Sequence, residues 1–301
     1  MPIIAPCALC LKTGPLLESH VLPAFVYKWL KDRSITGHIR FSETPNRRIQ
    51  DGLKKPWLCS NCEGRFSHNE THFANKLFYP WLKGQQHIYY GDWLLKFCVS
   101  VSWRVLKHCK GLNPDHVYTQ EQENLAQRAE ATWRAFLLDQ TPHPSSFEQH
   151  FLVFDVIEET TIHDLPNNIN RFLTGAVAMD IVGSNNAMMT YAKLGRFTIF
   201  GIIQPGKDKW EGTKIHVKHG LIKPGRFVVP YGLVDLFKEK AVHTKEAYES
   251  MSDLQHEKID AAAMQNIDRA IGSDQLASMM ADAKMFGEHA VLRKAKKPSK
   301  K

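Results

Sequence analysis

Two CxxC motifs, far apart in the chain, constrain this sequence more than any other feature. They are "CALC", with Cys7 and Cys10, and "LCSNC", with Cys59 and Cys62. Two thiolates three positions apart can reach one ion from a single turn, and two such pairs make a tetrahedral zinc site. We therefore predict one structural Zn²⁺ on these four cysteines, against the alternative that they pack without metal. The 48 residues between the motifs exceed the length of a compact zinc ribbon, so a further substructure is expected to fold between them.

The bulk composition indicates a globular protein in a reducing compartment. The chain has 301 residues, 43% of them hydrophobic, which suits one large domain or two ordinary ones. It has neither an apolar run of about 18 residues nor a secretory signal at its start, so we expect a cytoplasmic protein that does not enter membranes. The remaining cysteines, Cys98 and Cys109, are eleven positions apart in an apolar stretch, and we expect them to be buried thiols on one helix face.

Positive charge is concentrated at the two ends of the chain. Of the net charge of +8, residues 1–80 carry +5, residues 81–292 carry −3 and the tail carries +6. A basic segment that also holds metal ligands favours contact with phosphate. The basic tail, residues 290–301, is expected to be disordered and dispensable for chemistry.

The pattern of apolar residues divides the chain into three parts. Residues 1–80 are expected to form a zinc-bound unit, residues 81–289 an α+β domain, and residues 290–301 the basic tail. The middle part opens with a linker at 83–92. Helices are expected near 92–110 and 119–140, with Thr119 and Gln122 forming a capping box. Five or six antiparallel strands are expected between 150 and 230, and helices after Gly232.

The segment after the second CxxC motif is predicted to be a helix that carries two acids. Glu63 and Glu70 are seven positions, about two turns, apart, so a helix places them nearly in line. Phe66, Phe73 and Leu77 fall on the adjacent stripe and are expected to face the core. His68 and His72 share a further face, either as metal ligands or, more commonly, as exposed side chains.

In the order of these motifs the sequence resembles the HNH endonucleases, which are treble-clef proteins with a ββα-metal active site. The elements that carry the resemblance are Cys7/Cys10, "SHVLP" around His20, "TPNRR" around Asn46, and "LCSNC" followed by a helix. The longer string from Ser19 to Pro80 also looks like a group of uncharacterised bacterial HNH-like proteins. The resemblance covers about residues 5–80. Together with the pattern of the rest of the chain, it implies an α+β protein in which a zinc-bound treble-clef HNH-like domain precedes a mixed helical and antiparallel-sheet domain.

The sequence departs from the common HNH pattern at three points. The acid before the key histidine is replaced by Ser19, with Glu18 one position further back. Asn46 lies farther from Cys59 than usual. Glu63 stands where His or Asn usually follows the second CxxC motif.

The resemblance implies a metal-dependent hydrolase of DNA phosphodiesters, a class often found in bacterial defence against phage. His20 would be the general base, Asn46 would orient it, and Glu63 with Glu70 would bind a catalytic Mg²⁺ or Mn²⁺. Arg47, Arg48, Lys54 and Lys55 would contact the nucleic-acid backbone. RNA is the alternative substrate. Because a nuclease needs control of its target, residues 81–289 are expected to be a sensing or substrate-positioning domain, and they could bind a protein partner.

Each of these assignments also has a purely structural alternative. His20 could be a hydrogen-bonded structural histidine, Glu63 a first-turn acid complementing the helix dipole, and Glu70 a solvated acid. Asn46 could be a turn residue, and the basic residues a solvated loop. The whole unit could then be an inactive zinc-stabilised module that binds nucleic acid, or a scaffold for protein interaction.

Overall fold

A computed structural model describes residues 2–34, 36–110, 118–267, 271 and 273–291 of the chain. It is a mixed α+β structure with antiparallel sheets and a four-cysteine cluster near the N-terminus, which confirms the expected fold class in this coarse form. The chain divides into two compact units. The first unit comprises Met1–Tyr27, Asp51–Val153 and Val177–Pro230, and the second comprises Lys28–Gln50, Phe154–Ala176 and Tyr231–Lys301.

A four-stranded antiparallel sheet forms one layer of the first unit. Its spatial order is β5 (Gln149–Val153), β8 (Phe197–Gln204), β7 (Ala187–Leu194) and β6 (Val177–Ser184). The strands β7 and β8 are buried along nearly their whole length, as expected from their apolar sequences. Gly195 turns the chain between them with φ at 64°, a conformation that glycine adopts without a Cβ penalty.

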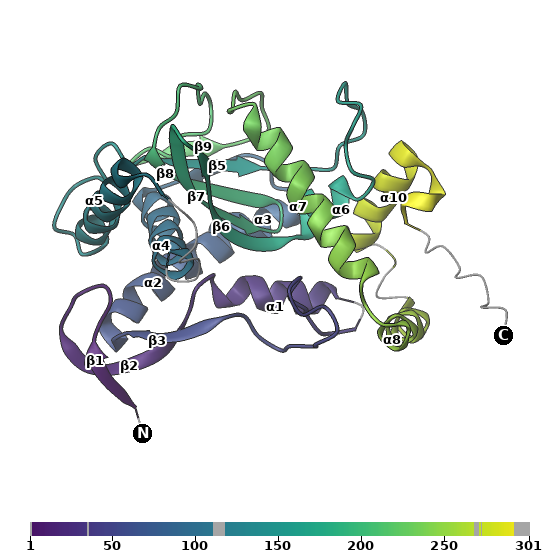
Figure 1. The fold of residues 1–301 in the computed structure, drawn as a ribbon, viewed down its shortest axis with the longest axis horizontal. Coiled ribbons are helices and arrows are strands. Elements are labelled where there is room, and N and C mark those ends of the chain that lie inside the picture. The colour runs from purple at the N-terminus through teal and green to yellow at the C-terminus, as the bar shows by residue number, and fades with distance from the viewer. Residues whose placement is uncertain (1, 35, 111–117, 268–270, 272, 292–301) are drawn as a thin grey trace. The chain divides into compact units, whose positions relative to one another are not determined.

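Helix α4 (Asp92–Cys109) is the central element of the first unit. It packs against β6, β7 and β8 and also contacts α2 (Ser60–Phe73) and α5 (Gln120–Leu137), so nearly every side of it is buried (Figure 1). Its apolar sequence predicts this burial. Cys98 is fully buried as expected, whereas Cys109, also expected to be buried, is half-buried at the end of the helix. The predicted capping box of α5 is confirmed, because Thr119 and Gln122 each accept a hydrogen bond from the other's backbone N–H at 3.1 Å.

The N-terminal part of the first unit is a small sheet followed by a helix. Its elements in chain order are β1 (Ile3–Pro6), β2 (Thr13–His20), β3 (Lys54–Leu58), α2, the π-helical turn η1 (Ala74–Phe78) and α3 (Tyr79–Leu82). The strands are antiparallel in the order β1-β2-β3. The predicted core side chains of α2 and η1, Phe66, Phe73 and Leu77, are all buried. Phe73 stacks on Phe97 of α4 with ring centroids 3.9 Å apart, so this part shares its core with the sheet-bearing part.

The first compact unit extends across the predicted boundary at residue 80. The predicted linker contains β4 (Ile88–Tyr90), which pairs with β9 (Gly220–Ile222). Within the range 150–230, where strands are predicted, residues 213–219 and 226–230 form only single bridges, at Lys214 and Val228. The predicted basic tail lies outside the described residues except for Ala290 and Val291.

The second unit is mainly helical. It contains α6 (Ile169–Gly175), α7 (Gly232–Glu249), α8 (Asp253–Gln265), α10 (Asp274–Phe286) and the short 3₁₀ turn η2 (Glu288–Ala290). Helix α1 (Ala24–Arg33) begins in the first unit and ends in the second. The buried carboxylate of Asp282 on α10 accepts hydrogen bonds from the backbone N–H of Asn170 at 2.8 Å and of Arg171 at 3.3 Å. A carboxylate from another helix thereby satisfies the first turn of α6.

Candidate metal centre and histidine site

The four predicted zinc ligands come together in the first unit. Cys7 and Cys10 lie in the turn after β1, and Cys59 and Cys62 lie at the start of α2. All four sulfur atoms lie within 4.8 Å of one another, with Cys10 Sγ and Cys59 Sγ 3.8 Å apart. A tetrahedral zinc site with Zn–S bonds of about 2.3 Å has sulfur atoms about 3.8 Å apart, so the donor set and its spacing fit zinc.

Backbone hydrogen bonds close the first cysteine turn and favour the thiolate form of Cys7, which is the form that binds a metal. The N–H of Leu11 donates to the Cys7 carbonyl at 2.9 Å, which closes the first turn, and Leu11 itself has φ at 63°. The N–H of Cys59 points at Cys7 Sγ at 3.4 Å. Burial raises the pKa of Cys7, but backbone N–H groups directed at its sulfur outweigh burial and lower this pKa to about 7. Burial and the neighbouring thiols raise the pKa of Cys62.

The candidate base His20 is the last residue of β2, at the open end of a strand–strand–helix arrangement. Its Nε2 lies 2.9 Å from Asp51 Oδ1, and its side chain is 15% exposed, which leaves it within reach of solvent. The other oxygen of Asp51 lies 2.6 Å from Lys54 Nζ. Burial raises the pKa of Asp51, but the contacts with Lys54 and His20 outweigh it and lower the pKa to about 2. Asp51 is therefore a carboxylate at neutral pH.

Arg104 of α4 contacts both the backbone of His20 and the predicted acid Glu70. The guanidinium is buried on α4 and donates from Nη1 to the His20 carbonyl at 3.1 Å. Its Nη2 lies 2.7 Å from Glu70 Oε1. Burial raises the pKa of Glu70, and the ion pair with Arg104 only partly offsets this effect. Arg104 thus fixes both the strand end that bears His20 and the carboxylate of Glu70.

The predicted catalytic cation site is not assembled as a convergent set of ligands. Glu63 is half-buried in the first turn of α2, and Glu70 is bound to Arg104. Within the described part of the chain, the four cysteines are the only group of three or more His, Cys, Asp or Glu side chains whose ligand atoms converge. Glu63 and His20 do act on Glu70 electrostatically, so the three predicted side chains lie in one neighbourhood.

Asn46 has a different partner from the one that the sequence suggests. It belongs to the second unit, where its Oδ1 accepts a hydrogen bond from the backbone N–H of Ser252 at 2.8 Å. The contact expected between Asn46 and His20 is made instead by Asp51. The reason is that the loop bearing Asn46 packs with the second unit, while the chain returns to the first unit only at Asp51.

The four predicted phosphate contacts are divided between the units. Arg47 and Arg48 are exposed in the second unit, whereas Lys54 and Lys55 lie on β3 of the first. Lys54 pairs with Asp51, and Lys55 Nζ lies 5.9 Å from the centroid of the Trp57 ring. Only the two lysines therefore share a unit with His20.

Sequence reasoning missed Asp51 and Arg104. Arg104 carried a signal, because an arginine in an otherwise apolar helical stretch must find a buried partner. Asp51 carried none that distinguished it from other loop acids.

Comparisons with protein-family models, with curated proteins and with solved structures returned no match. In the portion of the chain described by the structure, no helix has the length and apolar character needed to span a membrane.

Proposed function

We propose that the chain is a metal-dependent endonuclease of the HNH type that hydrolyses phosphodiester bonds of DNA, with RNA as the alternative substrate. One observation carries the proposal. His20 lies at the end of a strand in a strand–strand–helix arrangement held by four cysteines, and its Nε2 contacts a carboxylate. The biological role proposed for such a nuclease is bacterial defence against phage.

The His20–Asp51 pair suits general-base chemistry. If Nε2–H donates to Asp51, the lone pair lies on Nδ1, and that nitrogen can accept a proton from water. The ionised Asp51 fixes this tautomer and stabilises the imidazolium that forms. A hard cation would supply Lewis-acid stabilisation of the phosphate, with Glu63 as its first protein ligand. Glu70 could contribute only after releasing Arg104.

The test is nicking of supercoiled plasmid by the purified zinc-loaded protein with Mg²⁺ or Mn²⁺. His20→Ala should reduce the rate by about 10²–10⁴-fold, the usual contribution of a general base, without changing the zinc content. Asp51→Asn should reduce it less, because the base remains. His87→Ala is the matched control, since His87 is exposed and lies outside the site. Cleavage by His20→Ala at the wild-type rate, or no cleavage with any divalent ion, would refute the proposal.

The second candidate function is a zinc-stabilised module that binds nucleic acid without cutting it. This function is favoured by the ion pair between Glu70 and Arg104, because Glu70 is then not free to bind a catalytic cation. On this account a labelled oligonucleotide would bind without cleavage. Substitution of Lys54 and Lys55 by alanine would reduce the salt dependence of binding by up to about two counterions.

A further inference from the structure

A groove on the outer face of α2 is separate from the candidate nuclease site. We call it the α2 groove. It has a volume of about 720 Å³ and is lined by polar and basic side chains, among them Arg65, His68, His72, Lys76, Lys96 and Trp93. An α-helix turns about 100° per residue, so His68 and His72 lie about 200° from Glu70, which is two positions from each. The groove and the predicted acids thus occupy opposite faces of α2.

The α2 groove is lined by three basic side chains, Arg65, Lys76 and Lys96, against two acids, Asp92 and Asp139, and this excess of positive charge favours an anion. Asp139 is shared between two cations, because Arg65 Nη1 lies 2.5 Å from one of its oxygens and Lys96 contacts the other. Lys76 has no ion-pair partner among the described residues, and it projects from the π-helical turn η1. Such turns occur frequently at functional sites. The imidazoles of His68 and His72 also line the groove, with ring centroids 4.5 Å apart and ring planes inclined at 49°.

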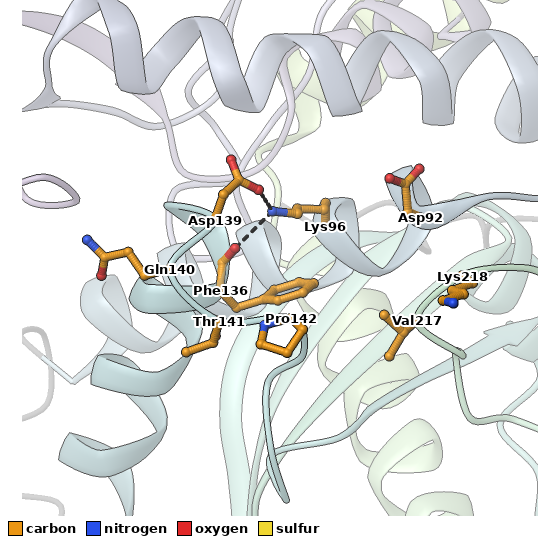
Figure 2. Close-up of a pocket in the computed structure, with 9 residues that line it drawn as sticks. All are labelled: Asp92, Lys96, Phe136, Asp139, Gln140, Thr141, Pro142, Val217 and Lys218. Carbon is orange, nitrogen blue, oxygen red and sulfur yellow. Dashed lines mark hydrogen bonds and ion pairs between the residues drawn. The ribbon is translucent and has the colours of Figure 1, made fainter.

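A second cavity continues the groove and is more apolar. Its volume is about 520 Å³, and it shares Asp92, Lys96 and Asp139 with the α2 groove. Figure 2 shows the Lys96 ammonium directed at the Asp139 carboxylate and the Phe136 carbonyl, with Pro142 next to the Phe136 ring and Val217 next to Lys218. The two cavities therefore form one site with a basic end and an apolar end.

We propose that this site binds a nucleotide, with the phosphates at the basic end and the base at the apolar end. Lysine and arginine ammonium and guanidinium groups are the usual protein partners of phosphate, and Arg65, Lys76 and Lys96 supply them here. A planar base can pack on the exposed Pro142 and Val217 side chains, whereas the Phe136 ring is buried with Lys96 Nζ 4.7 Å from its centroid. The combined size suits a ligand of this kind, since small-molecule sites typically span about 300–1,000 Å³. The proposal stands apart from the nuclease function, because no residue of the His20 site takes part.

The test is calorimetric titration of the full-length zinc-loaded protein with ATP, adenosine and tripolyphosphate, without added divalent metal. ATP should bind more tightly than either fragment. Lys76→Ala should weaken ATP binding by about tenfold, the effect of losing one charge-assisted contact. Val217→Asp should weaken ATP but leave tripolyphosphate less affected, because it places charge at the apolar end. Both side chains are exposed, so neither change removes a core residue.

Two control variants make the result specific. Arg128→Ala removes an exposed positive charge from α5, outside the groove, and should leave ATP affinity unchanged. His20→Ala should also bind ATP normally. No ATP binding at about 1 mM would overturn the proposal. So would equal loss in the Lys76 and Arg128 variants, tripolyphosphate binding as tight as that of ATP, or binding of a single-stranded oligonucleotide in place of ATP.

Discussion

At the scale of single residues, Arg104 links more of the candidate site than any side chain that the sequence singled out. Its guanidinium donates to Ser100 of its own helix, to the His20 carbonyl and to Glu70, and it lies over the Phe66 ring at 5.1 Å. The buried charge is therefore paired and hydrogen-bonded, which is the condition under which a buried arginine is tolerated. It ties α2, α4 and the end of β2 together.

Breaking the Arg104–Glu70 pair from one side should be strongly destabilising. Arg104→Met leaves the Glu70 carboxylate buried without its partner, and we expect a loss of about 3–5 kcal/mol in the free energy of unfolding. The measurement is urea unfolding of the zinc-loaded protein, followed by tryptophan fluorescence. Glu70→Gln should cost less, since the neutral amide can still accept from the guanidinium.

The double variant provides the control for this interpretation. Arg104→Met combined with Glu70→Leu removes both charges, and its loss should be smaller than the sum of the losses from Arg104→Met and Glu70→Leu made singly. Strictly additive losses would show that the pair is not coupled and that each side chain acts through other contacts.

At the scale of the structural element, the cysteine cluster sets where α2 begins. Cys59 precedes the first residue of the helix, and no side chain caps its N-terminus. The turn that carries Cys7 and Cys10 is attached to β3, because the N–H of Ala8 donates to the Trp57 carbonyl at 2.7 Å. A metal bound by the four thiolates would therefore hold the start of α2 against the β-sheet, through ligands rather than through a large local core.

Loss of one thiol should remove both the metal and the order of this region. Cys59→Ser should reduce zinc from one ion per chain to nearly none and lower the thermal midpoint, because metal binding and folding are coupled in small metal sites. The measurements are elemental analysis and calorimetry. Cys109→Ser is the matched control, since Cys109 lies on α4 outside the cluster. Retention of zinc by Cys59→Ser, or absence of zinc from the folded wild type, would contradict the assignment.

At the scale of the whole molecule, the segment that holds the four cysteines is not an independent module. Trp57 and Phe66 contact Trp103, with ring centroids 6.2 and 6.0 Å away, and Phe73 lies against Phe97. Trp103 and Phe97 belong to α4 and are fully buried. The core of the first unit thus depends on residues before and after position 80.

A fragment comprising residues 1–80 should not fold cooperatively on its own. It would expose the aromatic side chains that α4 covers, so we expect zinc binding without a sharp thermal transition and with poor dispersion in a proton–nitrogen correlation spectrum. The full-length chain under the same conditions is the reference. A cooperative transition in the fragment would show that the segment is a domain after all.

The sequence by itself determined the features that local patterns encode. The CxxC spacing identified the four cysteines, and helical periodicity identified α4, α5 and the buried face of α2. The apolar sequences of β7 and β8 identified two central strands. These predictions succeeded because ligand spacing, capping and side-chain periodicity depend on residues close together in the chain.

Only the tertiary structure decided which distant residues meet. Asp51 rather than Asn46 contacts His20, Arg104 occupies the predicted ligand Glu70, and β4 pairs with β9 across more than a hundred residues of sequence. The α2 groove likewise combines side chains from α2, η1, α4 and the end of α5. All of these contacts lie within the first unit and are set by how its distant segments pack. The local sequence around a hydrogen-bond donor or a carboxylate does not identify the partner that this packing supplies.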